Sequence, residues 1–147
     1  MDKKPTNPKD AVGELKVPMS VLPATVMAEA AVGMLEGAVK YGRHNYRGTD
    51  VKASIYYDAT QRHLLAWWEG QDTDSKSGLH HVTKAITSLI VLRDAMLNGS
   101  CIDDRPPTID PDFIDKLNAA AEKIIKQHAN EHPRHYTIKD KRHGKKA

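Results

Sequence analysis

Long stretches without an internal proline, with apolar residues at helical spacing, are the feature that most constrains the fold of this 147-residue chain. In residues 24–41 the apolar residues Val32, Leu35 and Val39 recur at intervals of three or four, which is the spacing of one helix face. Similar patterns predict helices over three further ranges, which are residues 51–69, 78–97 and 111–130. Since no strand pattern precedes the C-terminal tail, the sequence predicts an all-α fold, an antiparallel bundle of about four helices.

The predicted breaks between these helices come from residues with known local preferences. Gly42 ends the first helix, and a polar loop leads to Asp50, the expected cap of the second helix. Ser77 is the expected cap of the third helix, and Asp110, followed by a proline, marks the start of the fourth. Residues 1–23 contain four of the eight prolines, so we expect them to be extended or looped.

The second predicted helix is apolar over most of its circumference. Ile55, Ala59 and Trp67 lie on one side of it, while Leu65 and Trp68 point in other directions. A helix of this kind is buried on several sides, and about four helices of this length do not easily surround it. The pattern favours a homo-oligomer, a homodimer or a homotetramer, over a core helix in a monomer.

The net charge of +3 is concentrated in the C-terminal tail. Residues 131–147 contain six Lys or Arg residues and two acidic residues, a local net charge of +4. Such a tail is usually solvated, and contact with nucleic acid is the less favoured alternative. Cys101, the single cysteine, excludes an intramolecular disulfide. With no apolar run of about 20 residues and no secretory leader, we expect a cytoplasmic protein without a membrane segment.

Acids and bases on the predicted helices are the remaining candidates for chemistry, because the motifs of phosphate loops, dinucleotide sites, zinc proteases and serine hydrolases are absent. In the first predicted helix, Glu29, Glu36 and Lys40 fall on one stripe. They form either a site for a metal and an anionic ligand or a solvated face with a helical ion pair. Glu69, Asp72 and Asp74 supply oxygen donors of the kind that Mg²⁺ prefers, or else a polar turn.

An antiparallel hairpin of the second and third helices is expected to bring further acids together. Counting from a turn near Asp74 places Asp58 within about one helical turn of Asp94. If the first helix runs antiparallel to the second, Glu36 joins that layer. His81 is then expected to lie near Glu69 and Asp72 at the other end of the bundle. Carboxylates inside a helical bundle are a common metal site.

Five segments of the chain carry a resemblance. They are NPKDAVGELKVP, MLEGAVKYGRHNYR, ASIYYDATQRHLLAWWEGQDTDSKSGLHH, DDRPP and, more weakly, HPRHYTIKD. Together they resemble a phage and bacterial family of dATP/dGTP diphosphohydrolases, which is similar to the MazG-like all-α NTP pyrophosphohydrolases. The resemblance covers about residues 7–107. The chain departs from it by lacking a MazG-type EExxE run, and by carrying Gln71 in place of a glutamate and Lys84 in place of a second histidine.

The resemblance implies hydrolysis of a purine deoxynucleoside triphosphate, dATP or dGTP, to the monophosphate and pyrophosphate with Mg²⁺ or Mn²⁺. It also implies roles for individual residues. The implied metal ligands are Glu36, Glu69, Asp72 and Asp94. The implied catalytic residues are Glu36, Asp58 and His63, of which Asp58 would orient the attacking water. The implied substrate-binding residues are Lys40, Tyr41, Asn45, Arg47, Arg62 and His81.

The resemblance also bears on organisation. It implies a hydrolase core over residues 1–107, followed by a C-terminal helix and basic tail over residues 108–147, either in the same domain or as an appendage. The expected location, if a phage encodes the chain, is the host cytoplasm. Two other functions compete with hydrolysis. One is a non-catalytic helical oligomer that binds nucleotides or nucleic acid, and the other is a structural or host-interaction protein of a phage.

Overall fold

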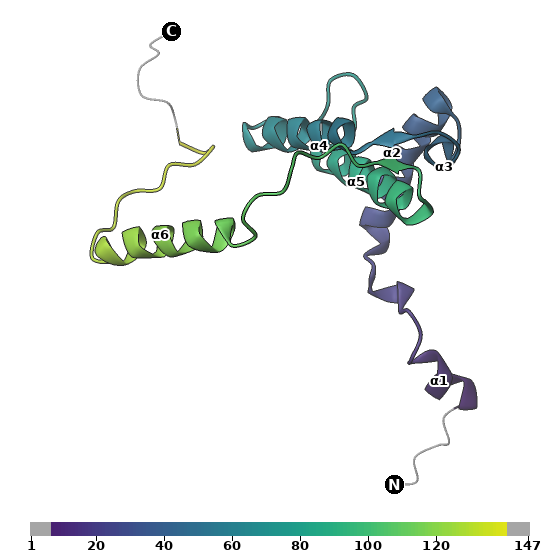
Figure 1. Cartoon of the computed structure of the whole chain (residues 1–147), viewed down its shortest axis with the longest axis horizontal. Coiled ribbons are helices and arrows are strands. Elements are labelled where there is room, and N and C mark those ends of the chain that lie inside the picture. Colours follow the sequence, from purple (N-terminus) through teal and green to yellow (C-terminus); the bar gives the residue numbers. More distant parts are fainter. Residues whose placement is uncertain (1–6, 141–147) are drawn as a thin grey trace. The chain divides into compact units, whose positions relative to one another are not determined.

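A computed structural model describes residues 7–140 and divides the chain into two units, Met1–Ile102 and Asp103–Ala147. In chain order the first unit contains α1 (Pro8–Gly13), the 3-10 helix η1 (Met19–Val21), α2 (Ala24–Tyr41), α3 (Asn45–Gly48), β1 (Val51–Lys52), α4 (Ala53–Trp68), α5 (His81–Asn98) and β2 (Cys101–Ile102) (Figure 1). The second unit contains α6 (Phe113–Gln127). The described chain is therefore mostly helical, as predicted.

The long helices lie where the sequence predicts them, with differences at their starts. α2 has the predicted bounds and stops at Gly42, whose φ of 95° suits a residue without a side chain. The expected caps of the next two helices were wrong, because Lys52 rather than Asp50 precedes α4, and His80 rather than Ser77 precedes α5. The His80 ring accepts the backbone N–H of the second α5 residue at 3.1 Å, so it satisfies a donor that helices leave free.

Short helical turns occupy stretches that were predicted as loops. In α1, the Asn7 side chain accepts the backbone N–H of Lys9 at 3.0 Å, which caps a helix that begins with Pro8. The 3-10 turn η1 follows in the same stretch, and α3 follows His44 in the expected polar loop. Helices of one or two turns contain too few residues for apolar periodicity to show, which is why the sequence did not predict them.

A two-stranded parallel sheet was also not predicted. Val51 pairs with Cys101, and Lys52 pairs with Ile102. The backbone N–H of Val51 donates to the carbonyl of Ser100 at 2.9 Å. Strands of two residues cannot show an alternating pattern. They form because the chain enters α4 and leaves α5 at the same place, so that the sheet fastens these two helix ends together.

α4 and α5 pack along each other as a helical hairpin (Figure 1). The parallel strands join the start of α4 to the end of α5. At the opposite end, the connecting loop closes through an antiparallel bridge between Thr73 and His80 and through the backbone of Asp74, whose N–H donates to Leu79 at 2.8 Å. The predicted hairpin of the second and third helices is thus present.

α2 packs on α5 through a close approach at Gly33. A methyl group added there would lie 2.7 Å from Cγ2 of Thr87, so α5 occupies the space that any side chain would need. One turn earlier, the Thr83 hydroxyl donates to the Glu29 carboxylate between the same two helices. Gly33 is buried, and the absence of a side chain there allows α5 to approach closely.

The large apolar side chains of the single chain are mostly exposed. The buried apolar residues are small, and they are Ala30, Val51, Ala53, Ala85 and Ala95. By contrast, Trp68 is 76% exposed, Leu65 is 62% exposed and Val39 is 76% exposed. Within residues 7–140, no large side chain is completely buried. One chain therefore leaves α4 largely uncovered, in keeping with the apolar breadth of its sequence.

The second unit is built around α6, whose residues are all exposed. Phe113, Leu117 and Ile124 lie on one side of this helix and charged residues on the other, which makes it amphipathic. Its cap residue is Asp112 rather than the expected Asp110, whose carboxylate instead accepts the Asp112 backbone N–H at 2.9 Å. Throughout residues 7–140, the helices are too short or too polar to span a lipid bilayer.

Candidate functional site

A cavity of about 770 Å³ lies beside the C-terminal half of α2. Its walls come from α2, from the segment that leads into α3, and from one face each of α4 and α5. This volume lies in the range that small-molecule sites usually have. Four residues that the sequence predicted for the site line the cavity, and they are Glu36, Lys40, Tyr41 and Asn45.

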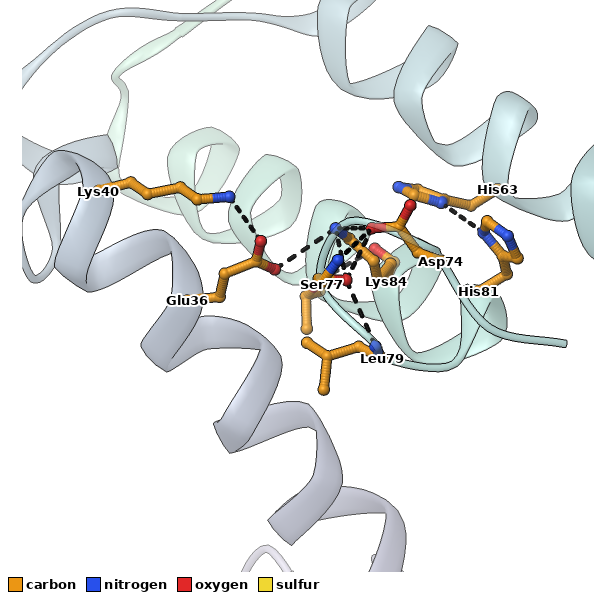
Figure 2. Close-up of polar contacts among 9 residues, drawn as sticks. Glu36, Lys40, His63, Asp74, Ser77, Leu79, His81 and Lys84 are labelled. Carbon is orange, nitrogen blue, oxygen red and sulfur yellow. Dashed lines mark hydrogen bonds and ion pairs between the residues drawn. The ribbon is translucent and has the colours of Figure 1, made fainter.

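A chain of ion pairs runs along one wall of this cavity. Glu36 joins two lysines, with Oε1 at 2.5 Å from Nζ of Lys40 and Oε2 at 3.4 Å from Nζ of Lys84. The Lys84 ammonium lies in turn 3.0 Å from Oδ2 of Asp74. Figure 2 shows Lys84 between the two carboxylates, one from α2 and one from the loop before α5. Two helices and a loop are therefore tied together by alternating charges.

A tight turn holds the carboxylate of Asp74 against Lys84. The Ser77 hydroxyl donates to Oδ2 of Asp74 at 2.7 Å, and the Ser77 backbone N–H donates to the same oxygen at 3.2 Å. The Lys84 ammonium also donates to the Ser77 hydroxyl at 3.2 Å. These donors, Ser77 first and Lys84 second, hold the pKa of Asp74 far below its usual range. Lys40, and then Lys84, lower the pKa of Glu36.

Aromatic side chains line another part of the cavity. Tyr41, Tyr46, Tyr56 and His44 all contribute to the wall. Nδ1 of His44 lies 3.2 Å from the Tyr46 hydroxyl, and the two rings meet edge to face with centroids 5.9 Å apart. His44 has a φ of 56°, a left-handed conformation that is uncommon outside glycine. Burial raises the pKa of Tyr56, so its hydroxyl stays protonated at neutral pH.

Two predicted histidines meet beside this cluster of charges. Nδ1 of His63 lies 2.9 Å from Nδ1 of His81, so one ring donates and the other accepts (Figure 2). His81 is 6% exposed, and within the described chain its buried Nε2 has no hydrogen-bond partner. Burial, followed by the charge of Lys84, lowers the pKa of His63. The environment of His63 therefore disfavours its protonated form.

Arg47 and Asp94, which were predicted to bind phosphate and metal, bind each other. Nε and Nη2 of Arg47 donate to the two carboxylate oxygens of Asp94 at 2.8 and 2.7 Å. This two-point contact raises the pKa of Arg47 and lowers that of Asp94. It joins α3 to the C-terminal part of α5. In this arrangement each side chain neutralises the other.

The remaining predicted residues lie apart from the cavity wall. Asp58, Arg62, Glu69 and Asp72 are exposed. Asp72 instead contributes its backbone carbonyl, which accepts the N–H of His81 at 2.8 Å. Over residues 7–140, no group of three or more His, Cys, Asp or Glu side chains lies close enough to hold a metal ion. The two expected gatherings of acids do not form in this part of the chain, and the roles of their members remain predictions.

Comparison with models of protein families identifies the family to which the chain belongs. Residues 6–105 match the model described as the N-terminal region of dATP/dGTP diphosphohydrolase. The chain belongs to this family. The match spans every element from α1 to β2, so the whole cavity lies within it.

A dATP/dGTP diphosphohydrolase of Salmonella phage PMBT28 is 32% identical to the chain over 90 residues. The aligned region is 61% of this chain and 30% of the phage protein, so the chain spans about a third of that relative's length. No solved structure gives a significant match.

Several residues of the site in this dATP/dGTP diphosphohydrolase family member were not among the predicted ones. Lys84, Arg43, Tyr46 and Tyr56 line the cavity. Asp74 was considered as an oxygen donor for Mg²⁺, and its ion pair with Lys84 was not predicted. The spacing of an aspartate and a serine three residues later is typical of a side-chain-stabilised turn, and it was available in the sequence. The position of Lys84 carried a signal as well, because the resemblance led us to expect a histidine there.

The C-terminal tail can be described only in part. Arg134 pairs with Asp140, and its guanidinium lies 4.9 Å from the centre of the Tyr136 ring. The other basic residues of the tail, apart from Lys139, lie outside the described residues. Contact between the tail and nucleic acid therefore remains a prediction.

Proposed function

We propose that this chain binds a purine deoxynucleoside triphosphate, dATP or dGTP, in the cavity beside α2 and hydrolyses it to the monophosphate and pyrophosphate. The observation that carries the proposal is that the family match encloses a cavity lined by Glu36, Lys40, Tyr41 and Asn45. The name of the phage relative points to the same reaction class.

The cavity wall offers groups that suit the parts of a nucleotide. Lys40, Lys84 and Arg43 are cations, and positioned cations stabilise the charge that develops on phosphate oxygens during phosphoryl transfer. Tyr41 and Tyr46 present aromatic rings for the base or the sugar. The walls combine apolar surface with a few charged groups, which is typical of a small-molecule site.

We include Mg²⁺ or Mn²⁺ in the proposal. Glu36 is the predicted metal ligand that lines the cavity. Mg²⁺ is usually held by one or two carboxylates together with substrate phosphates and water, so a site without a cage of three protein ligands suits it. When bound, such a cation polarises a phosphoryl oxygen and lowers the pKa of coordinated water. Glu36 would hold the cation, and the two lysines would bind and orient the phosphates.

We also propose that the chain assembles as a homodimer or homotetramer. The exposed apolar side chains of α4, Leu65 and Trp68 among them, support this, because contact with a second copy would remove them from water. Light scattering coupled to size exclusion should give a mass of two or four chains. A monomer at micromolar concentration would contradict the assembly without affecting the proposed reaction.

The test of the reaction is to incubate the full chain with each of the four dNTPs and Mg²⁺ or Mn²⁺, and to separate the products by ion exchange. We expect monophosphate and pyrophosphate from a purine substrate, with the activity removed by a chelator. Glu36→Gln should lower turnover at least about 100-fold, because it removes a charge from the reacting centre.

The matched control for Glu36→Gln is Glu122→Gln. Glu122 forms the same kind of ion pair with Lys126 on α6, at 2.5 Å and four residues apart. This control should retain full turnover. Diphosphate and orthophosphate as products would indicate a different phosphohydrolase. Absence of turnover in folded protein would favour a non-catalytic binding module.

A further inference from the structure

One carboxylate in the cavity wall holds two lysines at once. The Glu36 oxygens bind Nζ of Lys40 at 2.5 Å and Nζ of Lys84 at 3.4 Å. The Glu36 side chain is 23% exposed, and all three residues line the cavity. An anionic group that bridges two ammonium groups in a cavity occupies the position that a phosphate group would need.

The two lysines differ in how firmly the protein holds them. Lys84 is anchored from one side, where it donates to Asp74 at 3.0 Å and to Ser77 at 3.2 Å. An ammonium has three N–H donors, and the contact with Glu36 at 3.4 Å is the longest of the three. The Lys84 side chain is 18% exposed, whereas Lys40 is 55% exposed and lies on a flexible stem. The contacts with Glu36 are thus the ones that a ligand can replace most easily.

We propose that the Glu36 carboxylate occupies, in the free protein, the place of a phosphate group, and that a polyphosphate displaces it to bind Lys40 and Lys84 together. The choice of polyphosphate as the ligand class rests on the proposed function. Asp74 and Ser77 act as positioning residues, because they keep the Lys84 ammonium at the wall after Glu36 leaves. The displaced carboxylate is then available to a divalent cation that accompanies the phosphates.

This arrangement predicts opposite effects of removing the two kinds of charge. Without metal, the negative charge of Glu36 competes with an incoming polyphosphate for the lysines. Its removal should therefore strengthen metal-free binding, even though it weakens hydrolysis. Removal of the Lys84 charge should weaken binding. If Glu36 served only to hold the lysines in place, its removal would weaken binding as well.

The experiment is isothermal titration of the full chain with inorganic tripolyphosphate in the presence of EDTA. We expect Glu36→Gln to bind about tenfold more tightly than the unaltered chain, and Lys84→Met about tenfold more weakly, the size expected for one charged hydrogen bond. Lys84→Arg should retain binding because it keeps the positive charge. Matched controls are Glu122→Gln and Lys126→Met, which alter the α6 ion pair of the same 2.5 Å length and spacing.

Unchanged or weaker binding by folded Glu36→Gln would overturn the proposal, and so would unchanged binding by Lys84→Met. Circular dichroism checks that each variant is folded. If Lys84→Met fails to fold, Glu36→Gln and Lys84→Arg decide the question. The outcome is separable from the proposed function. The expected charge dependence without dNTP hydrolysis would leave this inference standing and reject the reaction, while hydrolysis without that charge dependence would do the reverse.

Discussion

The two ends of α5 both hold ion pairs, but in different surroundings. At the N-terminal end, Lys84 and Asp74 have side chains that are 18% and 17% exposed, and a turn and a second carboxylate complete the cluster. At the C-terminal end, Arg47 and Asp94 are 57% and 24% exposed and bind mainly each other. Lys84 of the first pair lines the cavity, whereas the second pair fastens α3 to α5.

The difference indicates that burial and shared partners, rather than the number of charges, determine how much an ion pair contributes to stability. Water replaces a lost partner at an exposed pair, so such a pair contributes little to stability. A half-buried charge that loses its partner is left without that compensation. Lys84 binds the carboxylates of Glu36 and Asp74 and the hydroxyl of Ser77. Its substitution therefore affects α2, α5 and the loop between α4 and α5 together.

The largest expected effect on stability comes from removing the shared cation. Lys84→Met should lower the free energy of unfolding by about 2 kcal/mol, because it leaves the Glu36 and Asp74 carboxylates near each other without their common partner. Arg47→Met should cost less, since water solvates the carboxylate of Asp94. Urea denaturation followed by circular dichroism measures both changes.

The double variant Lys84→Met with Asp74→Asn provides the control for this comparison. It also removes the Asp74 charge that Lys84→Met alone leaves without a partner, so the double variant should be more stable than Lys84→Met. Equal losses for Lys84→Met and Arg47→Met would mean that the two ends of α5 do not differ in the way their burial indicates.

A smaller effect is expected where α2 approaches α5 near the N-terminal cluster. Gly33→Ala should destabilise the chain by about 1–2 kcal/mol, because the new methyl group would lie 2.7 Å from Thr87 Cγ2. The Thr87 hydroxyl donates to the carbonyl of Lys84 at 2.9 Å, which limits its ability to move away. Denaturant unfolding measures the change.

Gly37→Ala is the matched control, since nothing lies within 4 Å of the added methyl group at that position. It should stabilise the helix by up to about 1 kcal/mol. A stabilised Gly33→Ala would show that α2 and α5 can separate without loss, and that the contacts between Glu36 and Lys84 do not depend on this close packing.

The sequence predicted the long helices because each has enough residues for apolar periodicity and a strong stop. It missed the strands at Val51 and Cys101, since two residues carry no pattern and their pairing depends on where two distant helix ends meet. Part of the site was predictable for a related reason. Glu36 and Lys40 share a helix face, so their spacing alone places them together.

The partner of Glu36 on α5 was not predictable in the same way. Lys84 reaches it only through the packing of α2 on α5 and the turn at Asp74. For Asp94, the sequence predicted the helix but not the partner. Arg47 binds both of its carboxylate oxygens, and it lies 47 residues earlier in the chain on a short helix that the sequence did not reveal.

The smallest expected effect concerns pH, and it also separates the two ends of α5. The pKa of His63 is lowered from its ordinary value of 6.5, chiefly by burial, so the folded chain binds fewer protons than the unfolded chain just below pH 6.5. Stability should therefore fall as the pH drops from 7.5 to 5.5. His63→Asn should reduce that fall, because the unfolded chain then loses the extra proton site. Arg47→Met, at the other end, should leave it unchanged, since arginine does not titrate in this range. Thermal unfolding at several pH values measures the slope for each variant. If His63→Asn kept the full slope, the titrating group would lie elsewhere, and His63 would not be what makes the N-terminal end of α5 sensitive to acid.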